Sequence, residues 1–228
     1  MKNIKNKIAI FVVSCFALFA LQTSASAVEG LSIGLGYHTG GAMGTGTEKK
    51  SDDTANTTEE DGAFAYDTPS VFVEFALNDQ FSMGVEYHPD AIDTPENLNK
   101  QDNGNGVNAN DGGSLSNKVK ASFEEHTTVY ANINMPYNTY LRLGYVMTDV
   151  ATKESLATGG AYNDADTDGY QVGLGYNHSV DNGFFVRVEV VATEYNDISA
   201  TNVNDSEKTV TVSEMYGATA SIKIGRSF

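Results

Sequence analysis

The sequence predicts an all-β fold, an eight-stranded antiparallel up-and-down transmembrane β-barrel. Apolar and polar side chains alternate with a period of two over much of the chain, and only a strand presents such a pattern as two faces. No apolar run of 18 or more residues follows residue 27, so a helical membrane span is not expected there. The connections between alternating segments are in turn long and short, which is typical of a meander crossing a membrane.

The first 27 residues are predicted to be a cleaved secretory signal peptide. They contain three lysines, an apolar core from Ile8 to Leu21, and a small-residue cleavage site that ends at Ala27. The core of about 14 residues is shorter than the roughly 20 that a spanning helix needs. Cys15 is the single cysteine, so the predicted mature chain, residues 28–228, forms no disulfide and consists of one barrel domain.

Acidic residues dominate the charge of the chain. The full sequence has a formal net charge of −16, and residues 28–228 carry 30 acidic against 11 basic side chains. This balance argues against nucleic acid as a partner. Much of the acidic excess falls in the long polar connections, where we expect surface-exposed, mobile loops that attract divalent cations weakly.

The first four predicted strands are residues 30–38, 66–77, 81–88 and 118–133. A tight turn at 78–80 joins the second to the third, and long polar stretches at 39–65 and 89–117 make the other two connections. Their apolar faces are Leu31, Ile33, Leu35 and Tyr37; Val71, Val73, Phe75 and Leu77; Phe81, Met83, Val85 and Tyr87; and Val119, Ala121, Phe123, Val129, Ala131 and Ile133.

The last four predicted strands are residues 140–148, 170–177, 184–193 and 209–228. Short turns at 134–138 and 180–183 precede the first and third of them, and the second turn carries the Asn-Gly dipeptide of a hairpin. Long polar stretches at 149–168 and 195–208 complete the alternation. The apolar faces are Leu141, Leu143, Tyr145 and Met147; Tyr170, Val172, Leu174 and Tyr176; Phe184, Val186, Val188, Val190 and Ala192; and Val210, Val212, Tyr216, Ala218, Ala220, Ile222, Ile224 and Phe228.

Aromatic residues fall at both ends of the apolar faces. If the short turns lie at one end of the barrel, one set is distant from the turns and the other is near them. Two aromatic rings around an apolar band are favoured by the two lipid interfaces, whereas a soluble barrel with an apolar interior gives no reason for them. The distant set is Tyr37, Tyr87, Tyr145, Tyr170 and Tyr216, and the near set is Phe75, Phe81, Tyr176, Phe184 and Phe228.

The chain ends on a long alternating strand with an aromatic last residue, Phe228, and repeats a Gly-x-Gly-Tyr segment at 34–37 and 173–176. With the strand count, these features resemble the small eight-stranded outer-membrane barrels that include OmpX and the transmembrane domain of OmpA, a porin-like class. The resemblance implies a monomer in the cell outer membrane, exported through the periplasm and surrounded by lipid and lipopolysaccharide. It also implies that Phe228 is part of the signal read by the barrel assembly machinery.

Charged residues on the inward faces form the candidate site. Three acids and three bases are expected in one layer of the interior, which in an eight-stranded barrel is just wide enough for side chains to fill. Isolated charges there would be costly, so the equal numbers predict a paired network that plugs the barrel. A charged constriction in a conducting pore is the alternative. The six residues are Glu74, Glu86, Arg142, Arg187, Glu189 and Lys223, with Lys120 and Glu124 expected higher in the interior.

No catalytic, cofactor or metal site is predicted. His38, His88 and His126 face inward near the barrel mouth, where we expect solvated side chains rather than a zinc or copper site. Asp164 to Gly169 resembles the start of a calcium loop but lacks the glutamate at the twelfth position. His126 and Thr128 invite comparison with the His-x-Ser pair of lipid A deacylases, but both side chains point away from lipid.

The expected function is therefore that of an integral outer-membrane barrel with a plugged interior and acidic external loops, acting in envelope structure or surface interaction. A small passive channel for ions or solutes is the alternative. A lipid-modifying enzyme is a distant third, so the chain is not expected to be an enzyme.

Overall fold

The structure, a computed structural model, describes residues 30–49, 57–101, 115–156 and 161–228, and the predicted signal peptide lies outside these ranges. Within them, no helix is long and apolar enough to cross a membrane. A 3-10 turn, η2 (Asp181–Gly183), lies between β8 and β9. The strands are β1 (Leu31–Lys49), β2 (Thr57–Ala76), β3 (Phe81–Tyr87), β4 (Ile92–Asp93), β5 (Asn97–Gln101), β6 (Leu115–Met135), β7 (Thr139–Leu156), β8 (Ala165–Ser179), β9 (Phe184–Tyr195), β10 (Ile198–Thr201) and β11 (Thr209–Ser227).

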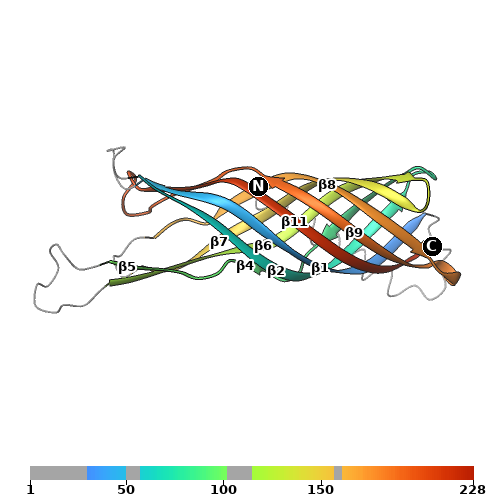
Figure 1. Cartoon of the computed structure of the whole chain (residues 1–228), viewed down its shortest axis with the longest axis horizontal. Coiled ribbons are helices and arrows are strands. Elements are labelled where there is room, and N and C mark those ends of the chain that lie inside the picture. The colour runs from blue at the N-terminus through green and yellow to red at the C-terminus, as the bar shows by residue number, and fades with distance from the viewer. Residues whose placement is uncertain (1–29, 50–56, 102–114, 157–160) are drawn as a thin grey trace, which may run out of the picture.

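Eight of these strands close into an antiparallel ring in the order β1, β2, β3, β6, β7, β8, β9 and β11. The ring closes because β11 pairs with β1 from Ser32↔Ser227 to Lys49↔Thr209. Figure 1 shows the result as a long cylinder of tilted strands. The predicted eight-stranded up-and-down barrel is confirmed.

Three tight hairpins lie at one end of the cylinder, here called the turn end. Tyr137 and Asn138 have φ of 64° and 60°, and Asn182 and Gly183 have φ of 65° and 80°, positive values that tight hairpin turns use. The chain also ends here, because the Phe228 N–H donates to the Leu31 carbonyl at 2.8 Å. The long connections lie at the opposite end, the loop end.

The polar stretches predicted as loops are in large part strand. Residues 39–49 pair with residues 57–67 in an uninterrupted register from Thr39↔Asp67 to Lys49↔Thr57. The prediction that residues 39–65 form a loop throughout was wrong. The prediction of a loop at residues 149–156 was also wrong, because β7 extends to Leu156. The ladder is held by backbone hydrogen bonds, so it continues beyond the apolar band even where neither face is apolar and the alternation disappears.

Two β-bulges reverse the faces of β6 and β11. Glu125 and Glu214 have φ of 52° and 51°, and the ladders shift register at both places. One extra residue moves every side chain beyond it to the opposite face. The predicted inward positions of Lys120 and Glu124 were therefore wrong, since their side chains are 33% and 43% exposed outside the barrel.

Apolar residues beyond the bulges take the inward positions instead. Phe123 and Val212 pack against a buried cluster of Val150, Ile198 and Met215. Sequence alternation had placed Ala121, Phe123, Val210 and Val212 on the lipid-facing side, which was wrong for the same reason. The result is an apolar interior in the part of the barrel near the loop end.

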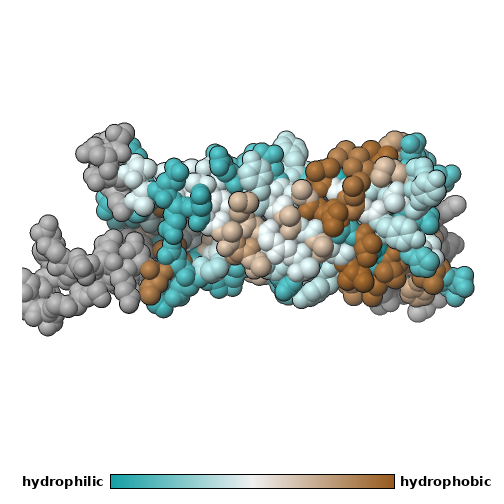
Figure 2. All heavy atoms as spheres, viewed as in Figure 1, coloured by the Kyte–Doolittle hydropathy of each residue, from teal (hydrophilic) through white to brown (hydrophobic). Residues whose placement is uncertain are grey.

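The outer surface carries its apolar side chains near the turn end. Figure 2 shows most of the strongly apolar residues gathered in that part of the cylinder. Tyr37, Tyr170 and Phe184 are 53%, 68% and 53% exposed there although their rings are apolar. Such exposure on a closed barrel matches a lipid-facing belt.

The barrel wall has a gap in its ladder next to the belt. β2 and β3 pair as far as Val71↔Tyr87, and continuing that register would set Pro69 opposite Pro89. Neither residue has an N–H to give to a ladder. Within the described residues β4 and β5 pair with β6 alone. We call this boundary the β2–β4 seam; it begins at the level of Tyr37, the partner of Pro69 on β1.

Candidate functional site

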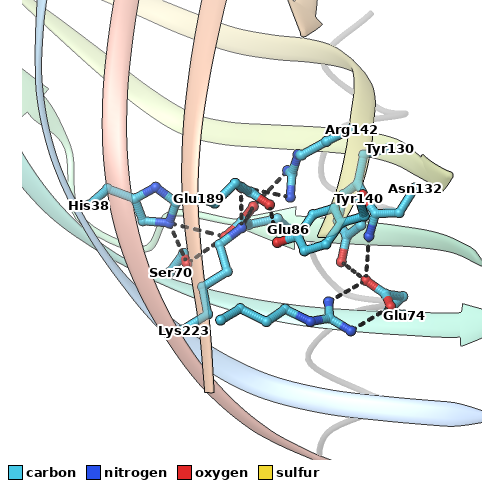
Figure 3. Close-up of polar contacts among 11 residues, drawn as sticks. His38, Ser70, Glu74, Glu86, Tyr130, Asn132, Tyr140, Arg142, Glu189 and Lys223 are labelled. Carbon is cyan, nitrogen blue, oxygen red and sulfur yellow. Dashed lines mark hydrogen bonds and ion pairs between the residues drawn. The ribbon is translucent and has the colours of Figure 1, made fainter. Parts of the chain in front are cut away.

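All six predicted interior charges lie together in the half of the barrel nearer the turn end. The part nearer the turn end is a bidentate pair, in which Arg187 donates to the two carboxylate oxygens of Glu74 at 2.7 and 2.9 Å. Tyr130 and Asn132 donate to the same carboxylate at 3.1 and 2.9 Å. Figure 3 shows Tyr130 and Asn132 beside Glu74, which is 5% exposed.

The other four charges form a second layer closer to the loop end. Lys223 Nζ donates to Glu86 at 2.8 Å and to Glu189 at 2.9 Å. Arg142 donates to Glu86 at 2.7 Å and lies 3.4 Å from Glu189. All four side chains are 2–3% exposed. With the Glu74–Arg187 pair, this network has three acids and three bases, so its formal charge is balanced. We call these six residues the plug.

Aromatic rings fill the space between the charged groups. The guanidinium of Arg142 lies 3.8 Å from the centroid of the Tyr130 ring, and the Tyr140 hydroxyl donates to Glu189 at 2.8 Å. Both rings lie over glycines directly across the ladder, Gly84 and Gly175. A Cβ on Gly175 would lie 2.1 Å from the Tyr140 ring. Sequence reasoning did not assign these tyrosines to the network, although each occupies an inward position with a glycine as its register partner.

On the loop-end side of the plug, the barrel contains an open cavity of about 1110 Å³, here called the vestibule. Its wall is mainly apolar because the two bulges turn apolar residues inward. The side chains of β2 and β4 on either side of the seam contribute to the lining. Residues that line it include Phe64, Ile92, Phe123, Val150, Ile198 and Met215.

The floor of the vestibule is formed by histidines and tyrosines. Tyr66, His126 and Tyr195 line both the vestibule and a much smaller cavity of about 20 Å³ beneath it. His126 Nε2 and the Tyr195 hydroxyl are 3.2 Å apart. His38 and His88 line the smaller cavity and are 5% and 6% exposed. The expectation of solvated histidines was wrong because the strands extend past them and enclose them.

The two other sequence motifs do not form a site. His126 and Thr128 are 6% and 1% exposed inside the barrel, away from its lipid-facing surface. The carboxylates of the calcium-like segment bind different partners. Asp164 accepts a hydrogen bond from the Thr152 N–H, whereas Asp168 accepts from the Tyr145 hydroxyl and from Asn196.

Comparison with known proteins bears on the fold. No protein-family model matches the chain, and no curated protein sequence does. Among solved structures, the outer membrane protein OprG from Pseudomonas aeruginosa is 13% identical, with a TM-score of 0.52 over 89% of this chain and 99% of that one. The outer membrane protease OmpT from Escherichia coli is 11% identical, with a TM-score of 0.50 over 90% and 99%. The chain therefore shares the β-barrel fold of these outer-membrane proteins.

Proposed function

We propose that this barrel is a non-enzymatic binding protein for small apolar molecules, with its loop end outside the cell and its axis closed by the plug. One observation carries the proposal: an apolar cavity of about 1110 Å³ lies directly above a balanced set of buried ion pairs. The cavity is slightly larger than the usual range of small-molecule sites, which is about 300–1,000 Å³. An apolar molecule would replace water that such walls bind poorly.

The plug argues against a passive channel for ions or hydrophilic solutes. A permeating ion would have to separate pairs such as Glu86–Arg142 and Glu189–Lys223, whose side chains are 2–3% exposed. Leaving any of these charges without its partner in the interior is costly. The eight-strand interior offers no other route once tyrosines and charged side chains fill it.

The β2–β4 seam supports an exit for an apolar ligand toward lipid. It lacks the backbone ladder that closes the wall between β2 and β3 nearer the turn end. It begins at the level of Tyr37 on the outer belt. Ile92 lines the vestibule beside the seam and is 7% exposed. Passage there requires side chains such as Ile92 to move, whereas passage through the plug requires buried charges to separate.

Surface interaction through the loop end is a second candidate. Glu59, Glu60 and Asp61 are exposed there, and divalent cations could join such carboxylates to lipopolysaccharide. We include in the proposal that the protein is a monomer and that Phe228, which is 41% exposed at the turn end, is recognised by the barrel assembly machinery.

A filled vestibule tests the binding function. Ala121→Trp adds an indole to the vestibule wall, and Val190→Trp adds the same group to the lipid-facing surface, where Val190 is 58% exposed. The probe is 1-N-phenylnaphthylamine, titrated into barrels in lipid nanodiscs with empty nanodiscs subtracted. We expect saturable binding that Ala121→Trp abolishes and Val190→Trp preserves.

Two results would contradict the proposal. Equal probe binding by the unmodified barrel and a folded Ala121→Trp variant would show that the probe occupies lipid or another surface. Steady single-channel currents from the unmodified barrel in a planar bilayer would favour the passive channel instead.

A further inference from the structure

Three of the four histidines of the chain gather at one level of the barrel, between the vestibule and the plug. They come from three different strands or strand ends: His38 from β1, His88 directly after β3, and His126 directly after the bulge of β6. The ring centroids of His38 and His88 are 4.7 Å apart, and those of His88 and His126 are also 4.7 Å apart. The fourth histidine, His178, is exposed near the turn end.

Two of these buried rings have a nitrogen without a hydrogen-bond partner. Among the described residues, nothing bonds to Nδ1 of His88 or to Nδ1 of His126. Each residue is 6% exposed, and both line the small cavity of about 20 Å³. A buried polar atom without a partner is uncommon and unfavourable, so these atoms indicate a missing ligand or water.

The carboxylate of Glu86 completes the set of donors. One ligand atom from each of His38, Glu86 and His88 lies within 4.8 Å of the other two. Glu86 Oε1 faces His38 Nε2 at 3.1 Å and the Ser70 hydroxyl at 2.7 Å, whereas Oε2 binds Arg142 and Lys223. Figure 3 shows His38 and Ser70 together at one side of the charged groups. Oε1 is therefore the oxygen that faces His38 and binds neither Arg142 nor Lys223.

We propose that His38, His88 and Glu86, with His126 beside them, bind one divalent ion of the zinc or copper type. Neutral imidazole is a preferred ligand of Zn²⁺ and Cu²⁺, whereas Ca²⁺ and Mg²⁺ prefer oxygen. Metal–nitrogen distances are about 2.0–2.1 Å, so donor atoms bound to one ion lie up to about 4 Å apart. The donors in this structure need only small side-chain movements to reach that spacing.

Two neighbouring cationic side chains affect how strongly the site would bind a divalent ion. Arg142 and Lys223 both bind Glu86, so a dication enters a place that already holds two positive charges. Neutral imidazoles reduce this repulsion because they provide ligands without adding charge. A bound ion would join β1, β3 and β6 at the vestibule floor, so binding is expected to stabilise the barrel.

Metal titration of the refolded barrel, without a histidine tag, tests the proposal. We expect one Zn²⁺ per barrel by calorimetry, a rise in the thermal transition with zinc, and nitrogen couplings in the Cu²⁺ electron paramagnetic resonance spectrum. His88→Gln should weaken Zn²⁺ binding by at least roughly tenfold. Tenfold is the lower limit for loss of a residue that only hydrogen-bonds to a metal ligand, and loss of a ligand itself should cost at least as much. His178→Gln removes a histidine elsewhere and should leave all three measurements unchanged.

Further variants keep the result decisive if His88→Gln folds poorly. His38→Gln should weaken binding as strongly, and each of His38→Gln and His88→Gln should remove one of the nitrogen couplings. Absence of metal binding to the unmodified barrel would overturn the proposal and leave water as the occupant. Binding that His38→Gln and His88→Gln leave unchanged would also overturn it, since the ion would then lie on acidic residues outside the barrel.

Discussion

Replacing Arg187 by alanine tests whether the ion pairs of the plug contribute to stability. The guanidinium makes two hydrogen bonds to Glu74, at 2.7 and 2.9 Å, and one to the Asn177 side chain at 3.2 Å. The side chains of Arg187 and Glu74 are 11% and 6% exposed. Arg187→Ala therefore leaves a buried carboxylate without its cation.

The loss in the free energy of unfolding depends on the groups that remain around Glu74 after the substitution. Removing one partner of a buried ion pair costs about 3–5 kcal/mol. Tyr130 and Asn132 still donate to Glu74 after the change, and the cavity left by Arg187 lies at the more exposed side of the pair. We expect a loss of about 3 kcal/mol, at the lower limit of that range.

The double variant Arg187→Ala/Glu74→Gln separates charge from packing. Glutamine keeps a hydrogen-bond acceptor for Tyr130 but carries no charge, so most of the lost stability should return. Unfolding in urea can be followed by circular dichroism in lipid vesicles, because the chain contains no tryptophan to report by fluorescence. Neither variant should conduct ions, because the second layer of the plug is intact.

A stability change below about 0.5 kcal/mol for Arg187→Ala, the usual range for surface substitutions, would refute the reasoning and show that water solvates the Glu74 carboxylate. A double variant no more stable than the single one would show a different cause. In that case the loss would come from the ring contacts of Arg187, such as that with Phe185 at 4.5 Å.

Two further predictions concern packing and pH. Gly175→Ala places a Cβ 2.1 Å from the Tyr140 ring and should cost about 1–3 kcal/mol in urea unfolding, whereas Gly62→Ala, with its nearest atom at 4.0 Å, should be neutral; equal effects would contradict this packing. The hydrogen bond from Lys120 lowers the pKa of Asp93 below its ordinary value of 3.8, so the attachment of β4 to β6 is stable at neutral pH and weakens as pH falls through the lowered pKa. A lower protection factor of the β4 amides in acid, calculated against the intrinsic exchange rate at each pH and absent in Asp93→Asn, is the expected result, and a protection factor independent of pH would contradict it.

The sequence by itself determines the strands where they cross lipid. In that part of the barrel each strand has one face against lipid and the other against the interior, so the physical difference between the two environments appears as alternation. Glu86 and Arg142 could be assigned to the interior on this basis alone. The turns were also predictable, because Asn182 and Gly183 adopt the positive φ that the hairpin needs.

The pairing of the interior charges depended on the three-dimensional register. Alternation places Glu74 and Arg187 inside, but they are 113 residues apart in sequence, and only the tilt and closure of the barrel bring them together. The same holds for Lys223, which reaches both Glu86 and Glu189 across the interior. The alternation indicates that the predicted layer of inward charges has equal numbers of acids and bases, and geometry decides which atoms meet.

The region near the loop end was decided by the tertiary structure. Backbone pairing there continues without an apolar face, so no alternation marks the strands. The bulges at Glu125 and Glu214 add one residue each and reverse the faces beyond them, which creates the apolar vestibule and encloses the histidines beneath it. A non-glycine residue with positive φ leaves no clear mark in the sequence, because the ladder on both sides of it imposes the conformation.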